Sequence, residues 1–431
     1  MYSQKTKSPN KAHIITAIGF MAALYAFSYI QRTGIPGTIF NEIQSDMKMT
    51  AEQVTYLSGI YLFIYASMQI ITGGLVDRFG PSRIILAGGT LLSIGSLLFP
   101  LSSNIPMLYA SRALVGLGGS LMYLSIIKEL DVRFSDHRFS VLLSMMILSG
   151  YSGGLFATKP LEIAVRNYGW RESLLVVAIA CSLTTIGAGL AFRNNTYVKK
   201  FQKGSEILDA LKSVSKNPMM YAVTYACAVS FMVFFLMQGV IGKKMLEDCC
   251  KMTSATAAST TFFMMLTSMT ASVLTGVVST AIGNRRRPLM IAVTVASVLG
   301  TIIAILLIHG NSSLAIPFAV LIGIGSAGAP IFAASVKELN LPNFAATSVG
   351  VMNGSVYILI TVVSIMSGRI LDLLGKAKVI SNTVHYGMHA YQVILVVCLV
   401  FATTGVLAAL LAKETSGINI HTKAPIKSDI I

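Results

Sequence analysis

The sequence predicts an all-α membrane protein in which twelve transmembrane helices form two pseudo-symmetric bundles of six. Three observations predict this class: the composition, the length of the apolar runs, and motifs that recur between the two halves of the chain. Of the 431 residues, 54% are hydrophobic and 12% are charged, and the mean hydropathy is +0.72. A soluble domain carries about 25% charged residues, so this chain has too little polar surface to cover a water-soluble particle.

The apolar runs have the length that a membrane span requires. About 20 apolar residues are needed to cross the hydrocarbon core, and a backbone in lipid must satisfy its own hydrogen bonds, so each span is expected to be a helix. The expected spans cover residues 13–38, 51–75, 83–101, 106–127, 138–160, 171–192, 218–242, 254–281, 288–308, 314–336, 344–370 and 387–411.

Positive charge predicts the orientation of these spans. The net charge is +16, which in a soluble protein would suggest binding to nucleic acid. Here most of the 33 Lys and Arg residues stand in the connections and tails on one side of the spans, as the positive-inside rule describes. We therefore expect the lipid bilayer, and not nucleic acid, as the partner. We also expect a multi-pass protein of the cell (inner) membrane with both termini in the cytoplasm.

The basic segment 193–217 divides the chain, because six expected spans precede it and six follow it. This gives an N-terminal six-helix bundle at 1–192, a cytoplasmic linker at 193–217, and a C-terminal six-helix bundle with a short cytoplasmic tail at 218–431. Within the linker, residues 205–215 have the pattern of a short amphipathic helix that lies on the inner membrane surface.

Motifs recur between the two halves at a nearly constant offset. Segments 73–83 and 276–286, which are 203 residues apart, both keep a Gly, a second Gly seven positions later, and an Arg three positions after that. The Gly-x-Gly at 116–118 recurs 207 residues later, and the Lys-Glu-Leu at 128–130 recurs 209 residues later. Each match falls on the same span of its half, which indicates an internal duplication. In transporters of this plan, the substrate binds between the halves near the membrane midplane.

The loop after the second span carries a family resemblance. Gly73-x-Leu75-x-Asp77-Arg78-x-Gly80-x-x-Arg83 resembles the signature loop between spans 2 and 3 of the major facilitator superfamily, and Arg112-x-x-x-Gly116 with Gly118 and Gly119 resembles its span 4 motif. The resemblance covers the whole chain, and it implies that the loop latches the cytoplasmic gate through Gly73, Asp77, Arg78, Gly80 and Arg83.

Elementary physical chemistry agrees with that role for the loop. Gly80 permits a tight turn, and the charge pairs can form in one conformation and break in the other. The alternative is that these charges only mark orientation. In the second copy, Thr280 stands where Asp77 stands in the first, which weakens the expectation of a charge latch in the second half.

The charges inside the spans are positive. All 17 Asp and Glu residues and all six His residues fall in expected loops or within about a turn of a span end. The spans retain Arg32, Arg112 and Lys159, although a central Arg or Lys costs about 2.5–3.5 kcal/mol on insertion. A substrate anion is a natural partner, because the planar fork of Arg grips a carboxylate or phosphate with two hydrogen bonds. A coupling ion (proton or sodium) would use an edge residue such as Glu162 or Glu172, or the substrate's own ionisation, or play no part.

Arg32 is the main candidate for substrate contact, because Tyr25, Ser28 and Arg32 share one helix face. This stretch resembles the first span of facilitators for organic anions, where an Arg near the end of an aromatic run binds the anion. Together with segments 65–70 and 169–171, it is also similar to the phagosomal transporters of intracellular bacteria, which implies amino acids or nucleosides. The alternative for Arg32 is snorkelling to the outer interface. Arg112 has a gating or structural alternative, and Lys159 has the alternative of an interface anchor.

Polar side chains at helical spacing extend the expected site. Span 2 places Tyr61, Tyr65 and Gln69 on one face, span 11 does the same with Asn353, Tyr357 and Thr361, and span 7 holds Tyr221, Tyr225 and Gln238. The alternative is interhelical hydrogen bonding, worth about 0.6 kcal/mol for each bond. The expected substrate-binding set is Arg32, Tyr25, Ser28, Tyr61, Tyr65, Gln69, Arg112, Gln238, Asn353 and Tyr357.

These features predict a secondary active transporter, a symporter that moves a small anionic or zwitterionic solute such as an organic acid or amino acid by alternating access. The alternatives are an exporter or facilitator of a neutral or drug-like solute, and a transporter-like solute sensor. The Gly-Pro pair that drug/proton antiporters carry in span 5 is missing from segment 149–160, which argues against efflux of hydrophobic cations. The sequence has no catalytic constellation, Walker A motif or metal-ligand spacing. We therefore expect a monomer without enzyme activity, cofactor or metal.

Overall fold

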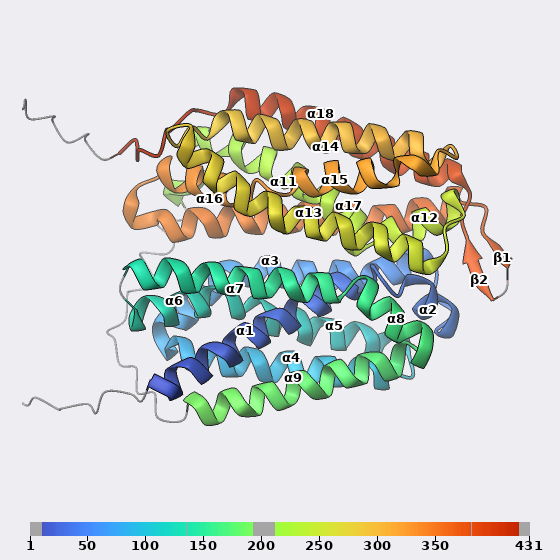
Figure 1. The fold of residues 1–431 in the computed structure, drawn as a ribbon, viewed down its shortest axis with the longest axis horizontal. Helices are drawn as coiled ribbons and strands as arrows, with labels where there is room; N and C mark the ends of the chain where they lie inside the picture. The colour runs from blue at the N-terminus through green and yellow to red at the C-terminus, as the bar shows by residue number, and fades with distance from the viewer. Residues whose placement is uncertain (1–10, 135, 193–211, 381, 422–431) are drawn as a thin grey trace, which may run out of the picture.

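The computed structural model describes residues 11–134, 136–192, 212–380 and 382–421, and nearly all of its regular structure is helical (Figure 1). The elements of the first half are α1 (Lys11–Gly34), α2 (Phe40–Asp46), α3 (Ala51–Phe79), α4 (Pro81–Leu101), α5 (Ile105–Ser120), α6 (Met122–Arg133), α7 (Asp136–Phe156), α8 (Lys159–Tyr168) and α9 (Trp170–Phe192). The amphipathic helix expected at 205–215 falls largely outside the described residues.

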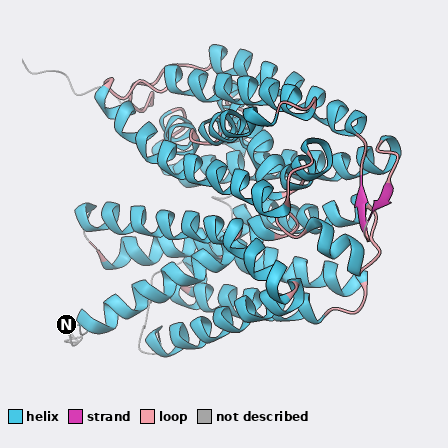
Figure 2. Ribbon diagram, turned by 45° about the vertical axis from the view of Figure 1, so that its right-hand side comes forward, coloured by secondary structure: helices cyan, strands magenta, loops and turns pink. Residues whose placement is uncertain are grey.

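The second half has the same plan with a few additions. Its helices are α11 (Pro218–Gly239), α12 (Gly242–Cys250), α13 (Ser254–Ala281), α14 (Arg287–Ile308), α15 (Ala315–Gly325), α16 (Ala329–Glu338), α17 (Ala345–Leu374) and α18 (Met388–Leu411). The short 3₁₀ turns η1 (Ser312–Leu314) and η2 (Pro342–Phe344) precede α15 and α17. The strands β1 (Lys378–Ile380) and β2 (Thr383–His385) form an antiparallel hairpin before α18 (Figure 2).

The prediction of an all-helical membrane protein is confirmed. Ten helices or end-to-end helix pairs among the described residues are long and apolar enough to cross a membrane. α1 packs along α7 and α9, and α3 packs along α17 and α5, so these two helices run beside the ten spans. With α1 and α3, the ten candidate spans make up the twelve transmembrane helices that the apolar runs predict.

Local signals set the helix ends. Thr50 begins α3 with a capping box, because its hydroxyl accepts from the Gln53 amide at 3.2 Å while the Gln53 side chain accepts from the Thr50 amide at 3.0 Å. Asn104 caps α5 and Thr253 caps α13 in the same side-chain-to-amide manner. Gly80, with φ of 84°, occupies the single-residue break between α3 and α4, a backbone conformation that glycine adopts without strain.

Three expected single spans are each built from two helices. The span expected at 106–127 turns at Leu121 between α5 and α6, directly after Gly118 and Gly119. The spans expected at 138–160 and 314–336 break just before Pro160 and Pro330, each of which stands in the first turn of the second helix. A proline tolerates that position because its missing N–H has no helical acceptor there.

The two halves lie one above the other in Figure 1, with α1–α9 below and α11–α18 above. The closest approach between the halves joins α3 to α17. A Cβ placed on Gly368 of α17 would lie 2.7 Å from the Cα of Glu52, so a glycine is needed for this approach. The end where α1 begins and α18 ends is called here the terminal side, and the end that carries β1 and β2 is called the hairpin side.

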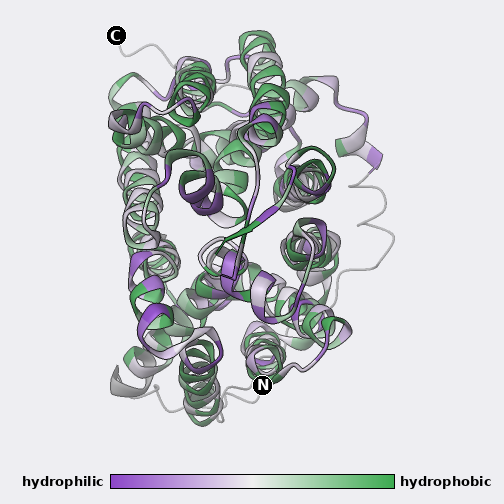
Figure 3. Ribbon diagram, turned by 90° about the vertical axis from the view of Figure 1, so that its right-hand side faces the viewer, coloured by the Kyte–Doolittle hydropathy of each residue, from purple (hydrophilic) through white to green (hydrophobic). Residues whose placement is uncertain are grey.

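The hairpin side holds elements that the apolar runs do not predict. α2 and α12 are short polar helices that follow the first and seventh spans, and β1 pairs with β2 through Val379 opposite Val384. β2 contacts α2 across the two halves. Figure 3 looks at this side and shows hydrophilic ribbon in connections that face the viewer, with more hydrophobic helix bodies behind.

Candidate functional site

A cavity of about 460 Å³ lies between the two halves. Its walls come from α1, α3, α6 and α7 of the first half and from α11, α13, α16 and α17 of the second. It extends from Arg32 and Gln238 to Lys337 and Glu338 in the last turn of α16, on the terminal side. Cavities of a few hundred Å³ are typical binding sites for small molecules.

Arg32 projects into this cavity from the last turn of α1. Its Nη1 donates a hydrogen bond to the Tyr357 hydroxyl at 3.0 Å, and its guanidinium carbon lies 3.9 Å from the centre of the Tyr29 ring. Its Nε atom is buried without a hydrogen-bond partner. No ion pair of Arg32 with a carboxylate is found among the described residues. The guanidinium therefore keeps donor capacity for an acceptor that enters the cavity.

Aromatic side chains line most of the cavity around Arg32. Tyr25 and Tyr29 meet edge to face with ring centres 5.1 Å apart, and Tyr65 meets Tyr357 in the same way at 4.8 Å. The other aromatic residues of the lining are Tyr123, Tyr151, Phe231, Phe234 and Phe235. Such a wall offers apolar ring faces together with hydroxyl groups that orient a polar solute.

Six of the ten residues expected to bind substrate line the cavity: Tyr25, Arg32, Tyr65, Gln238, Asn353 and Tyr357. Both side-chain polar atoms of Gln238 are buried without hydrogen-bond partners, although the residue borders the cavity. An amide with this unused capacity is suited to a polar ligand.

The other four expected residues lie beside the lining and not in it. Ser28 is buried and donates to the Tyr25 carbonyl at 2.7 Å, so it closes a bond within α1. Tyr61 and Gln69 are buried on α3, and the Tyr61 ring packs against Arg112. On α3 only Tyr65, the middle residue of the predicted stripe, lines the cavity, whereas on α1 the middle residue, Ser28, is the one that does not.

Arg112 is a fully buried residue whose donors are used by the backbone. Its guanidinium donates to the carbonyls of Leu57 at 3.0 Å, Gln31 at 3.0 Å and Ile35 at 3.2 Å. The last carbonyls of a helix have no partner within the helix, so Arg112 on α5 satisfies the end of α1 and ties it to α3. This geometry fits the structural alternative for Arg112.

The spacing analysis missed several cavity residues. Tyr29 follows Tyr25 by one helical turn, so the i, i+4 spacing was a usable signal. Tyr151 lies in the glycine-rich segment of α7, and Ser268 and Ser272 lie one turn apart on α13. Phe231, Phe234 and Phe235 lie seven, four and three residues before Gln238 on α11, so the helix face of Gln238 was a usable signal for them.

Lys159 connects the two halves. Its ammonium donates to the Ser259 hydroxyl of α13 at 2.6 Å, from the first residue of α8. It is not part of the cavity lining.

The expected gating loop lies on the terminal side at the junction of α3 and α4. Gly73 has open space around the position of a Cβ, and Gly80 forms the break between the helices. Arg78 lies 5.1 Å from the Phe79 ring, and Arg83 is exposed. The backbone of Asp77 belongs to the last turn of α3.

The Lys-Glu-Leu repeat has matching contacts in the two halves. Glu129 accepts from Ser82 at the start of α4 at 2.8 Å and pairs with Arg133, while Glu338 pairs with Arg286 before the start of α14 at 2.8 Å. Each glutamate therefore links the end of the fourth span of its half (α6 or α16) to the start of the third span (α4 or α14). In the second half, Thr280 replaces the aspartate of the first half, which argued against a charge latch there. The structure nevertheless has an ion pair between Arg286 and Glu338 in that region.

The backbone around Arg286 carries a further anion. Glu414 accepts from the backbone amides of Arg286 and Arg287 at 2.8 Å each, and from those of Thr415 and Ser416 at 2.9 Å each. Burial opposes the charged form, but these four amide hydrogen bonds prevail and lower the pKa of Glu414 below its usual value.

Hydrogen bonds between the halves close the hairpin side. Asp372 of α17 accepts from the amides of Ala51 at 2.9 Å and Glu52 at 2.7 Å, which begin α3. Tyr386 accepts from Gln44 at 2.7 Å and donates to Asp372 at 3.2 Å. Burial and the Asp372 carboxylate raise the pKa of Tyr386, so its hydroxyl stays protonated and able to donate. The halves are thus joined on the hairpin side, whereas the cavity lining extends to Lys337 and Glu338 on the terminal side.

Fold and cavity define a multi-pass membrane transporter with a central site. The sequence matches the model of the Major Facilitator Superfamily over residues 21–358. The chain belongs to the major facilitator superfamily.

Curated relatives match over shorter segments. The chain is 29% identical over 159 residues to monocarboxylate transporter 13 of Rattus norvegicus, covering 36% of each chain. It is 22% identical over 170 residues to a probable sulfoacetate transporter of Cupriavidus necator, covering 37% of each. It is 27% identical over 167 residues to the tetracenomycin C resistance and export protein of Streptomyces glaucescens, covering 38% of this chain and 30% of that protein. The matched segments span about a third of these relatives.

Solved structures match over nearly the whole chain. A POT family transporter in complex with 5-aminolevulinic acid has a TM-score of 0.74 at 14% identity, covering 95% of this chain and 99% of that one. A bacterial homolog of the human lysosomal transporter Spinster, in an inward-facing and unoccupied conformation, has a TM-score of 0.71 at 15% identity, covering 94% and 97%. These likenesses confirm the fold.

Proposed function

We propose that the protein is a secondary active transporter that moves a small anionic or zwitterionic solute, such as an organic acid or an amino acid, by alternating access. One observation carries the proposal: Arg32 presents a buried guanidinium to the central cavity with an unpartnered Nε and without a carboxylate partner among the described residues. A buried charge is costly unless it is paired, so an anion in the cavity supplies what the protein does not.

The geometry also suggests the form of the solute. A carboxylate can accept two hydrogen bonds from the guanidinium fork, while the Tyr29 ring holds one face of that fork. Gln238 and Asn353 border the same cavity and offer amide groups to a second polar end. A monocarboxylate transporter and a probable sulfoacetate transporter are among the relatives, and both names describe carriers of organic anions.

The conformation and orientation follow from the positive-inside distribution of Lys and Arg. If the terminal side is cytoplasmic, the cavity reaches the cytoplasm and the hairpin side closes the outer face of the cell (inner) membrane. The structure is then an inward-facing state. A symport cycle would alternate it with an outward-facing state in which the hairpin side opens and the terminal side closes.

Uptake into proteoliposomes tests the proposal. Wild type and Arg32→Gln are compared for labelled carboxylates and amino acids, with matched neutral amides as solutes. Arg369→Gln is the control, because Arg369 is an exposed arginine of α17. We expect anion uptake in wild type and in the control, and a loss of at least tenfold in Arg32→Gln. Equal uptake by all three variants would contradict the proposal, and binding without uptake would favour a solute sensor.

The aromatic lining favours one second candidate, an exporter of a neutral or drug-like solute. Six tyrosines and three phenylalanines border the cavity, which suits a large apolar ligand. One relative is a tetracenomycin C resistance and export protein. For such a solute, Arg32→Gln leaves transport unchanged and Tyr65→Ala or Phe235→Ala reduces it.

A further inference from the structure

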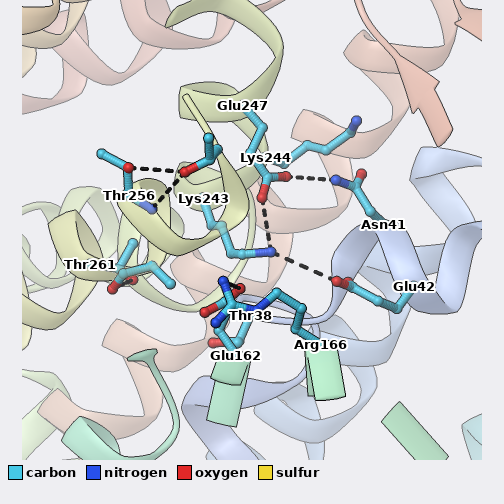
Figure 4. A network of polar contacts seen from close by, with 12 residues as sticks. Thr38, Asn41, Glu42, Glu162, Arg166, Lys243, Lys244, Glu247, Thr256 and Thr261 are labelled. Carbon is cyan, nitrogen blue, oxygen red and sulfur yellow. Dashed lines mark hydrogen bonds and ion pairs between the residues drawn. The ribbon is translucent and has the colours of Figure 1, made fainter. Parts of the chain in front are cut away.

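A second group of buried charges lies on the hairpin side, outside the central cavity (Figure 4). Lys243 of α12 is 3% exposed, and its ammonium lies 2.9 Å from Glu247 and 4.0 Å from Glu42 of α2. Asn41 donates to the other oxygen of Glu247 at 2.6 Å. The cluster therefore joins α2 of the first half to α12 of the second.

Glu162 of α8 is the third carboxyl of this cluster. Its side chain is 2% exposed, and neither carboxyl oxygen has a hydrogen-bond partner within the part of the chain that the structure describes. Arg166 approaches it at 4.0 Å, which is too long for a hydrogen bond, and the arginine side chain is 55% exposed. Figure 4 shows Glu162 beside Thr38 and near Lys243, with no bond drawn to it. Thr38 donates its own hydroxyl to the Ala157 carbonyl at 2.5 Å.

The charges of the cluster do not balance. Glu42, Glu162 and Glu247 face one buried lysine, and Arg166 adds one solvated positive charge at the edge. The side chains of Glu162 and Glu247 are 2% and 8% exposed, and that of Glu42 is 30% exposed. If all three carboxyls were ionised, the excess negative charge would stand in a largely buried cluster, which is costly. A single proton bound to one carboxyl removes this excess charge. The resulting O–H group can also donate a hydrogen bond to a neighbouring carboxyl oxygen that has no partner.

The surrounding charged groups do not supply this missing charge. Lys244 pairs with Asp248 of its own helix at 2.8 Å, and His385 of β2 also contacts Asp248 at 2.8 Å. Lys159 of α8 donates to Ser259, and Asp46 of α2 pairs with Arg171. Lys251 is exposed to solvent at the rim of a cavity that Glu42 and Glu247 also border.

A route from the hairpin side reaches the cluster. A second cavity of about 780 Å³ is bordered by Glu42, Glu247 and Asp248, together with residues of the hairpin. Burial raises the pKa of Glu42 above its usual value, although Lys243 opposes the shift. Burial alone would lower the pKa of Lys243, but Glu42, Glu247 and Glu162 raise it, so the lysine stays charged.

We propose that Glu42, Glu162 and Glu247 form a proton-binding site of the hairpin-side gate, which holds one proton when the gate is closed and releases it when the gate opens. Opening separates α2 and α8 from α12, so water reaches the carboxyls and their ionised forms become favourable. By linkage, a state that binds more protons is favoured as the pH falls, so acid on the hairpin side closes the gate. The proposal rests on the alternating access of the proposed function, and it holds for any solute.

Native cysteines report on this gate without any solute. Cys249 and Cys250 lie at the end of α12, partly buried in the closed state. Full-length protein in nanodiscs is labelled with a maleimide at pH 8 and pH 5, and labelling of the peptide that contains both cysteines is measured by mass spectrometry. The rate for a variant divided by the wild-type rate at the same pH cancels the pH dependence of the thiol itself.

The double variant Glu42→Gln/Glu162→Gln carries permanently neutral groups and resembles the protonated cluster. We expect it to label about tenfold more slowly than wild type at pH 8, which corresponds to a difference of about one pKa unit between the two states, and at an equal rate at pH 5. In Lys243→Gln, labelling should slow at a higher pH than it does in wild type, because the three carboxyls then lack a buried cation. Asp131→Asn, which removes an exposed carboxyl of α6, should match wild type at both pH values.

Two results would overturn the proton site. Faster labelling of the double variant at both pH values would mean that the carboxylates only hold the gate shut through Lys243. A ratio that is the same at pH 8 and pH 5 would mean that the cluster takes up no proton in this range. Neither result depends on anion transport, so the fate of the proposed substrate class is decided separately.

Discussion

Replacing Arg112 or Arg32 by glutamine should impair two different properties of the protein, thermal stability in one case and anion binding in the other. Arg112 gives its donors to three backbone carbonyls, whereas Arg32 gives one bond to Tyr357 and otherwise faces the cavity. Arg112→Gln should therefore lower thermal stability, and Arg32→Gln should lower anion binding at nearly unchanged stability.

The expected loss for Arg112→Gln follows from the acceptors that it leaves. The carbonyl of Leu57 lies within α3 and has a helical donor of its own, so two acceptors at the end of α1, Gln31 and Ile35, lose their charged partner. A buried polar group without a partner costs about 1–3 kcal/mol, which gives about 4 kcal/mol for the pair. Unfolding entropy of about 2.1 cal/mol/K per residue over 431 residues converts this to about 4 °C.

For Arg32→Gln the expected loss is in affinity. Hydrogen bonds to a charged group are worth about 1.5–3 kcal/mol, and each 1.4 kcal/mol is a factor of ten, so anion affinity should fall about 10- to 100-fold. Thermal unfolding in detergent, with and without a saturating anion, measures both quantities on one sample. If Arg112→Gln kept wild-type stability and lost anion affinity as Arg32→Gln does, the assignment of Arg112 as a backbone clamp would be refuted.

Three further predictions address the cavity, the gate and the terminal side. Gln238→Leu should weaken binding of a polar solute about tenfold without loss of melting temperature, because its two unpartnered polar atoms leave the protein interior; ligand-dependent thermal shifts measure both effects. Asp372→Asn removes the carboxylate at the start of α3, an interaction worth about 0.3–1 kcal/mol, and should raise maleimide labelling of Cys249 and Cys250 severalfold; an unchanged rate would mean that Asp372 does not hold the gate. Glu414→Gln should lower the melting temperature at pH 7, where the carboxylate with its lowered pKa stabilises the fold, and the difference from wild type should vanish as the pH falls through that pKa; a constant difference from pH 7 to pH 4 would argue against the amide-bound carboxylate.

The rods of the fold could be predicted because they depend on a property of each segment alone. An apolar run of sufficient length must be helical in lipid, whatever it packs against. The breaks within three rods could not be placed in the same way, because Pro160 and Pro330 permit a helix to begin but do not require the preceding residues to leave one. That choice is made by tertiary packing.

The cavity could be predicted only in part, because a shared helix face does not say what the face meets. Tyr65 and Tyr61 lie one turn apart on α3, yet only Tyr65 borders the cavity, while Tyr61 packs against Arg112. α3 contacts α5 and also borders the cavity, so the neighbour that each turn meets decides its role. Arg32 was identifiable because its charge is expensive wherever it points in the membrane.

The hairpin side lay beyond sequence prediction for a different reason. Its contacts join α2, α12 and the hairpin, which are short polar segments that form no recognisable pattern alone. The sequence marks Glu162 as an edge residue for coupling to a proton, but it does not show which side chains surround it. The carboxyls that surround Lys243 are 120 and 205 residues apart along the sequence, counting from Glu42 to Glu162 and from Glu42 to Glu247.

The polar contacts that close the hairpin side are few enough for this side to open. Among the described residues, six hydrogen bonds cross between the halves there. At about 0.5–1.5 kcal/mol net for each, opening forfeits roughly 3–9 kcal/mol. On the terminal side, the glutamate pairs of the repeat lie within each half, Glu129 with Arg133 and Glu338 with Arg286, and so they persist when the halves move. The opening cost must therefore be met by new contacts across the terminal side, by hydration of the released carboxyls, or by a solute that joins Arg32 to the second half. Because Tyr357 already bonds Arg32 across the cavity, an anion that engages both residues can link the state of the site to the state of the gate.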